Sequence, residues 1–164
     1  MWTCVSLALV SPLTAQPSQD TAAPQPDPGT DLPPQTLLAP GLYVFQTRTR
    51  AGSCNDAPRT GYVTSAVATL DGVPGSRTMT MQLLNSKYWP TWTLNIMADG
   101  SVIGTANMSG GKDDTKGTSR FELRAKKSRF QGVGARNYPG QVDGQAARCT
   151  LDYDALLKPL DGDR

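Results

Sequence analysis

Two pairs of aspartates are the residues in this 164-residue chain whose type and spacing would suit catalysis or metal binding. Asp152 and Asp154 would share one face of a strand, and Asp113 and Asp114 are adjacent in a segment flanked by glycines. Paired carboxylates carry out general acid–base catalysis or bind Ca²⁺. Neither pair has the density of oxygen ligands that a calcium loop needs, so we interpret both pairs as surface charges.

Histidine is absent from the sequence, and glutamate occurs once, at Glu122. Histidine is the most common metal ligand and the only side chain that titrates near neutral pH without help. Its absence excludes Ser-His-Asp and Cys-His catalysis as well as zinc sites that contain histidine. The sequence therefore predicts a protein that is not an enzyme, with no catalytic residue, no metal and no cofactor.

Cysteine occurs at three positions, Cys4, Cys54 and Cys149. Cys4 lies in a leader that we expect to be removed, so the mature protein keeps an even pair. Cysteine pairs in exported proteins form disulfides, and we predict a Cys54–Cys149 bridge. It would contribute roughly 4.7 kcal/mol in the chain-entropy model. Two buried free thiols are the alternative, and a lipid on Cys4 is disfavoured because no hydrophobic region precedes it.

An aromatic segment, KYWPTW at residues 87–92, separates two runs that read as strands. Trp92 begins an alternating run and is expected in the core. Tyr88 and Trp89, with Lys87 before them, would stack on sugars or anchor a protein interface if they are exposed. They would close the open end of a barrel if they fold inward. We take Lys87, Tyr88 and Trp89 as the foremost candidates for contacting a partner.

Positive charge is concentrated in residues 116–136, where Glu122 is the only acid. The basic face that we expect there consists of Arg120, Arg124, Lys126, Lys127 and Arg129. Such a face would contact anionic lipid headgroups, an acidic polysaccharide or an acidic protein patch. The alternative is a solvated strand whose charges prevent pairing with other chains. No basic-aromatic motif accompanies the charges, so we expect no nucleic-acid partner.

The first 40 residues differ in composition from the rest. Residues 1–15 contain a short apolar stretch followed by small residues, which is typical of a signal peptide. Residues 16–40 contain seven prolines and three aspartates, which predicts a disordered linker. Residues 41–164 carry all 16 Lys and Arg residues against 11 acids, a net charge of +5. We predict an extracytoplasmic protein that is periplasmic, on the outer surface or secreted, and that has no transmembrane span.

From Gly41 onwards, short runs of alternating apolar and polar residues are separated by turn residues, as in an all-β protein. The expected strands are residues 42–49, 62–70, 78–84, 92–98, 102–108, 121–125, 128–135 and 147–153. A helical turn is expected before Pro159. Short connections favour antiparallel neighbours. We predict a domain at 41–164 that is a small up-and-down β-barrel, or a β-sandwich, of about eight strands with one disulfide.

The function that these features predict is a non-catalytic binding module outside the cytoplasm. It would contact an envelope protein or a glycan through loops at one end of the barrel, and contact with a membrane surface is compatible with the basic face. A lipocalin-like barrel that encloses a small apolar ligand is the second interpretation, and an enzyme of unknown type is the third. A lumen filled by Tyr43, Phe45, Trp92, Phe121 and Phe130 would favour the first.

Overall fold

The computed structural model describes residues 38–110 and 117–160. The chain divides into two units, residues 1–32 and 33–164, and all of the described residues belong to the second unit. The signal peptide expected at 1–15 and most of the linker expected at 16–40 lie outside the described residues, as do Asp113 and Asp114. These assignments stay predictions.

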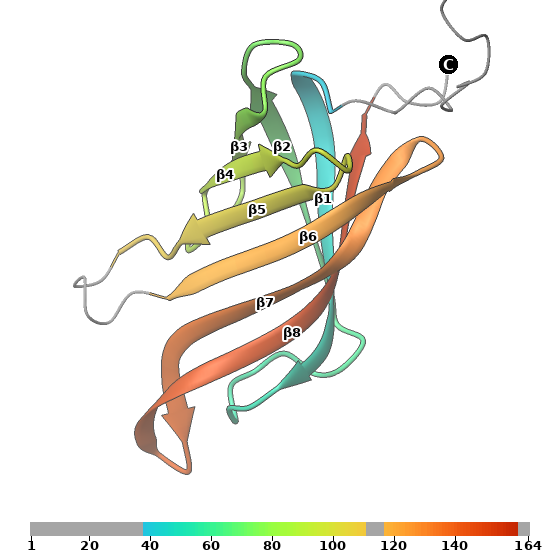
Figure 1. Cartoon of the computed structure of the whole chain (residues 1–164). Helices are drawn as coiled ribbons and strands as arrows, with labels where there is room; N and C mark the ends of the chain where they lie inside the picture. Colours follow the sequence, from blue (N-terminus) through green and yellow to red (C-terminus); the bar gives the residue numbers. More distant parts are fainter. Residues whose placement is uncertain (1–37, 111–116, 161–164) are drawn as a thin grey trace, which may run out of the picture. The chain divides into compact units, whose positions relative to one another are not determined.

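Eight antiparallel strands form a closed barrel in which successive strands pair and the last pairs with the first (Figure 1). The strands are β1 (Gly41–Gly52), β2 (Val63–Asp71), β3 (Thr78–Leu83), β4 (Thr91–Ile96), β5 (Val102–Asn107), β6 (Thr118–Lys126), β7 (Arg129–Val142) and β8 (Gln145–Pro159). The predicted barrel is therefore confirmed, and the sandwich alternative is wrong. Within residues 38–110 and 117–160 no helix has the length and hydrophobicity needed to cross a membrane.

Buried and exposed residues alternate along the strands, and the buried ones face the interior of the barrel. In β3, Met79, Met81 and Leu83 are buried while the residues between them are exposed. Trp92 and Leu94 of β4 follow the same pattern. Because successive side chains of a strand point to opposite faces, a period of two in hydrophobicity fixes which face lines the lumen. The lumen-facing residues expected from the sequence are confirmed at these strands.

Aromatic side chains fill the middle of the lumen. The ring centroid of Trp92 lies 5.0 Å from that of Phe121 and 5.7 Å from that of Phe45. Phe45 and Phe121 are 5.3 Å apart, and each of the three side chains is at most 3% exposed. Tyr43 and Phe130 are also buried, as expected. The barrel interior is thus a packed core at this level.

The last two strands, β7 and β8, are longer than expected. β7 continues through Pro139 and Gly140, where the sequence indicated a loop. β8 continues to Pro159, so the helical turn expected there is wrong. For β8 the cause is pairing with the distant strand β1: Phe45 of β1 is opposite Leu157, and Tyr43 is opposite Pro159. These pairs close the barrel.

A disulfide joins the β1–β2 loop to the β7–β8 hairpin. Cys54 is bonded to Cys149, 95 residues further along, and their Cα atoms are 5.5 Å apart. The amide of Asn55 donates to the carbonyl of Gln141 at 3.4 Å, and its side-chain amide donates to Asp143 Oδ1 at 3.3 Å. The predicted bridge is confirmed. Such bridges are typical of proteins that meet oxidising conditions.

Candidate functional site at one end of the barrel

Consecutive connections of an up-and-down barrel alternate between its two ends. The β1–β2, β3–β4 and β7–β8 connections lie at one end, which we call the disulfide end, and the β2–β3, β4–β5 and β6–β7 connections lie at the other (Figure 1). The candidate residues from the sequence are divided between these ends, since residues 87–89 belong to the β3–β4 connection and residues 127–128 to the β6–β7 turn.

A pocket of about 300 Å³ is present at the disulfide end, and we call it the end pocket. Its walls come from the β1–β2 and β3–β4 loops, from the end of β5 and from β7 and β8. The lining residues are Asp56, Pro58, Tyr88, Trp89, Met108, Arg136, Tyr138, Pro139 and Leu151. Ligand pockets in proteins typically measure about 300–1,000 Å³, so this one suits a small group.

Arg136 places a positive charge in the end pocket. Its guanidinium carbon lies 5.8 Å from the ring centroid of Trp89 and 4.8 Å from that of Tyr153. Its Nε is buried without a hydrogen-bond partner, and among the described residues Arg136 forms no ion pair. Partial burial removes some of the hydration of this charge, and contact with the two rings offsets part of that loss.

Two phenols accompany Arg136, and burial raises the pKa of both. For Tyr153 a hydrogen bond with Ser119 and the charge of Arg136 oppose the rise in pKa. For Tyr138 the negative charge of Asp56 raises the pKa further, while Arg136 opposes it. Both phenols are therefore neutral at physiological pH and keep their O–H donors. The Tyr153 hydroxyl lies 2.9 Å from Ser119 Oγ and donates to the carbonyl of Arg120 at 3.2 Å, whereas the buried Tyr138 hydroxyl has no hydrogen-bond partner in residues 38–110 and 117–160.

The aromatic segment divides into an exposed part and a buried part. Tyr88 is 49% exposed, and the exposed Lys87 has its Nζ 5.4 Å from the centroid of the Tyr88 ring. Trp89 is only 7% exposed and packs in the core, so exposure of Trp89 is ruled out and the inward alternative is correct. The Trp89 amide donates to Ser86 Oγ at 3.1 Å, and its carbonyl accepts from Trp92 Nε1 at 3.0 Å. These bonds hold the indole against the lumen.

The basic face does not join the end pocket. Arg120 and Arg124 point outward from β6 and share Glu122, at 3.9 Å and 3.5 Å, and Arg124 also pairs with Asp99 at 3.2 Å. Lys126 and Arg129 are exposed and paired in register across the β6–β7 turn, where Lys127 has a φ of 58°. Two residues of the face are thus partly neutralised, and the other three lie at the end of the barrel opposite Tyr88.

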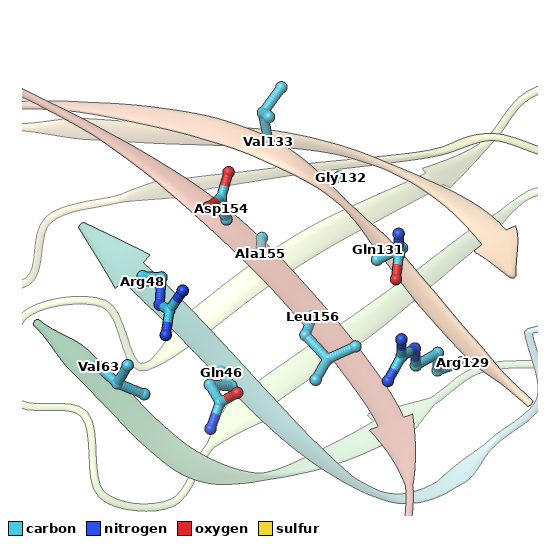
Figure 2. A pocket seen from close by; sticks show the side chains of 10 residues that line it. All are labelled: Gln46, Arg48, Val63, Arg129, Gln131, Gly132, Val133, Asp154, Ala155 and Leu156. Carbon is cyan, nitrogen blue, oxygen red and sulfur yellow. The ribbon is translucent and has the colours of Figure 1, made fainter. Parts of the chain in front are cut away.

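Figure 2 shows a second hollow, of about 550 Å³, on the outer surface of the barrel. Arg48 of β1 and Arg129 of β7 flank it, with Leu156 of β8 between them in this view. In the described part of the chain, the two buried side-chain atoms that lack a hydrogen-bond partner, Nε of Arg136 and the Tyr138 hydroxyl, both belong to residues that line the end pocket and not this groove. Unpartnered buried groups mark the end pocket as the better candidate.

The carboxylates of the described residues do not gather into a catalytic or metal site. Asp152 and Asp154 lie on the exposed face of β8, and Asp154 is 3.8 Å from Arg50 Nε. Asp56 lies near the sulfur atoms of Cys54 and Cys149, but these are bonded to each other. One carboxylate beside a disulfide is a poor donor set for a metal ion.

The residues that make the end pocket distinctive, Arg136, Tyr138 and Asp56, were missed as site residues in the sequence. The period of two that puts Phe130 in the core also puts Arg136 and Tyr138 on the inward face of β7. The strand predicted at residues 128–135 ends one residue before Arg136, so a longer predicted strand would have included Arg136 and Tyr138. Asp56 gave no such signal, because the disulfide and the hairpin bring its loop to the pocket. Comparison of the chain with protein-family models, with curated proteins and with solved structures gave no match.

Proposed function

We propose that this protein is a non-catalytic, extracytoplasmic binding module, an accessory component of the cell envelope or secretome. It contacts a protein or glycan partner through the disulfide end of its barrel. The observation that carries this proposal is the end pocket, in which Nε of Arg136 and the hydroxyl of Tyr138 are buried without a hydrogen-bond partner among the described residues, beside the exposed ring of Tyr88.

The packed lumen supports a binding module of this kind over a lipocalin-like barrel. Phe45, Trp92 and Phe121 occupy the middle of the barrel, where an enclosed apolar ligand would need space. Recognition then belongs to the ends, and the disulfide end offers both a pocket and an exposed aromatic ring.

A location outside the cytoplasm is supported by two features. The Cys54–Cys149 bridge is of the kind that persists under oxidising conditions. The apolar stretch within residues 1–15 is typical of a signal peptide, and the proline-rich residues 16–40 would act as a tether.

Two variants test which surface contacts the partner. The first is Lys87→Ala combined with Tyr88→Ala at the disulfide end, and the second is Arg124→Glu combined with Lys126→Glu on the basic face. Tagged protein is used to capture partners from the native envelope at low and high salt. We expect the first variant to lose the partner and the second to keep it. Capture should depend little on salt, because salt weakens mainly contacts between exposed charges, which it screens over about 10 Å.

The opposite pattern would overturn the proposal. Retention of the partner by the first variant and its loss by the second, together with steep salt dependence, would assign the function to the basic face. Circular dichroism of both variants serves as the control for folding. Both variants alter exposed side chains, so the fold should persist.

A further inference from the structure

We infer that the end pocket binds an acidic sugar residue, with Arg136 holding the carboxylate of the sugar. This inference rests on the proposed function and names the ligand class of that site. The chemistry of the pocket supplies a cation, a neutral hydroxyl, a carboxylate and aromatic surface within about 300 Å³.

Arg136 supplies the site for the carboxylate. A guanidinium stays charged at any physiological pH and presents N–H donors in a planar fork that matches a carboxylate. Among the described residues no carboxylate pairs with Arg136, and its Nε has no hydrogen-bond partner. The rings of Trp89 and Tyr153 fix the guanidinium in place, which reduces the entropy that binding would cost.

Tyr138 and Asp56 supply contacts that a simple carboxylate would not use. Tyr138 lines the pocket, and its hydroxyl is buried without a hydrogen-bond partner among the described residues. Asp56 lines the same pocket and accepts hydrogen bonds, so it disfavours a ligand that is only anionic. A ligand that carries a carboxylate together with hydroxyl donors satisfies both residues.

The remaining walls suit the apolar face of a sugar ring. Tyr88 exposes about half of its side chain at the pocket, and Pro58 and Met108 add further apolar surface. Aromatic rings combine a large apolar surface with low conformational entropy, which suits packing against C–H groups. A pocket of this size accommodates a ring-sized ligand rather than an extended peptide.

Calorimetric titration of the purified protein tests the inference. The probe is D-glucuronate. The two control ligands are D-glucose, which lacks the carboxylate, and acetate, which lacks the sugar ring. We expect glucuronate to bind saturably and at least about tenfold more tightly than either control ligand, because each control ligand leaves polar groups of the pocket unpaired. The acidic sugar could belong to a polysaccharide or be a free monosaccharide, and an oligosaccharide that ends in glucuronate distinguishes the two. Tighter binding of the oligosaccharide than of the monosaccharide indicates a polysaccharide, and equal binding indicates a free sugar.

Substitutions in the pocket then assign the contacts. Arg136→Gln should weaken glucuronate binding about tenfold or more, and Tyr138→Phe about fivefold. Tyr138→Phe removes a hydroxyl that has no hydrogen-bond partner among the described residues, so it should not lower stability, and a loss of binding is then not a folding defect. Arg120→Gln is the matched control, because Arg120 is an exposed arginine on the outer face of β6, and its binding should be unchanged.

Three results would overturn the inference. One is equal binding of acetate and glucuronate, and the second is undiminished glucuronate binding by Arg136→Gln. The third is binding of a glutamate-containing peptide through Arg136 with no binding of glucuronate, which would leave the disulfide end as the binding surface. Failure of the proposed function is seen separately, as partner capture that survives the Lys87→Ala Tyr88→Ala variant.

Discussion

Tyr153 connects the core of the barrel to the end pocket. Its hydroxyl contacts Ser119, and its ring lies beneath the guanidinium of Arg136. The ring also fills the space beside Gly134, where an added Cβ would lie 2.5 Å from ring atoms. Only glycine at position 134 allows the ring to approach β7 so closely.

The raised pKa of Tyr153 predicts a dependence of stability on alkaline pH. Burial favours the neutral phenol in the folded state, whereas unfolded tyrosine titrates near pH 10. The resulting stabilisation is present in full below about pH 10 and is lost as pH rises through the raised folded pKa. Chemical denaturation between pH 8 and 12, combined with tyrosinate absorbance, measures this loss.

Tyr153→Phe is the control for the alkaline loss of stability. This variant cannot ionise at position 153, so its stability should fall less steeply above pH 10 than that of the wild type. Titration of Tyr153 in the folded protein at the same pH as free tyrosine would contradict the prediction.

We expect the main role of Trp89 to be in the stability of the folded barrel. Its side chain is 7% exposed and belongs to the core, so Trp89→Ala should lower the free energy of unfolding by about 3–5 kcal/mol. The adjacent Tyr88→Ala removes a ring that is half exposed and should change stability much less. Urea denaturation of both variants measures the difference, and equal stability of the two would show that Trp89 is not part of the core.

At the level of elements, the disulfide connects two segments that the barrel alone leaves loosely held. Among the described residues, pairing of β6 with β7 ends at Thr118 and Asn137, and beyond that point β7 pairs in register with β8 alone. The β7–β8 hairpin therefore depends on its contacts with the β1–β2 loop, and Cys54–Cys149 is the covalent one.

Removal of the bridge should loosen this hairpin more than the rest of the barrel. Replacing both Cys54 and Cys149 with alanine is expected to cost about 2–5 kcal/mol of stability. Amide hydrogen exchange should accelerate most in residues 138–148. Uniform acceleration across all strands, or none, would contradict a local role. Non-reducing peptide mapping of protein from its native compartment verifies that the bridge forms.

The strands that local pattern predicts well are those with a regular alternation. β3 and β4 match their expected bounds to within two residues, because alternating Met, Leu and Trp leave no other face to bury. The strand predicted at residues 147–153 ends too early, because Ala155, Leu156 and Leu157 favour a helix locally. Pairing with β1 overrides this preference, and no local feature of the sequence reports such pairing.

β7 was also underestimated, for a different reason. Pro139 and Gly140 ordinarily mark a turn, but here they pair with Arg148 and Ala147, in a part of β7 whose one paired strand among the described residues is β8. Proline is tolerated in such an edge segment. The end pocket was therefore only half predictable: Tyr88 and Trp89 are visible from composition, but Arg136 and Tyr138 depend on the true length of β7.

At the scale of the whole molecule, we predict that the leader at residues 1–15 is removed. Residues 1–15 resemble a signal peptide, so we expect a mature N-terminus within residues 16–24. Mass spectrometry of exported protein measures this directly. Retention of Met1 in exported protein would contradict a signal peptide, and a diacylglycerol on Cys4 would replace it with a lipoprotein anchor.

Closure of the barrel between β1 and β8 has a consequence for how the chain folds. The strands that complete the barrel come from opposite ends of the folded sequence, with Tyr43 opposite Pro159. Such high contact order is associated with folding times of milliseconds to seconds. During synthesis, β1 and β7 keep unpaired backbone groups until β8 has been made. A chain that stops before residue 145 therefore presents two open edges to its neighbours, and edge-to-edge aggregation is its expected fate.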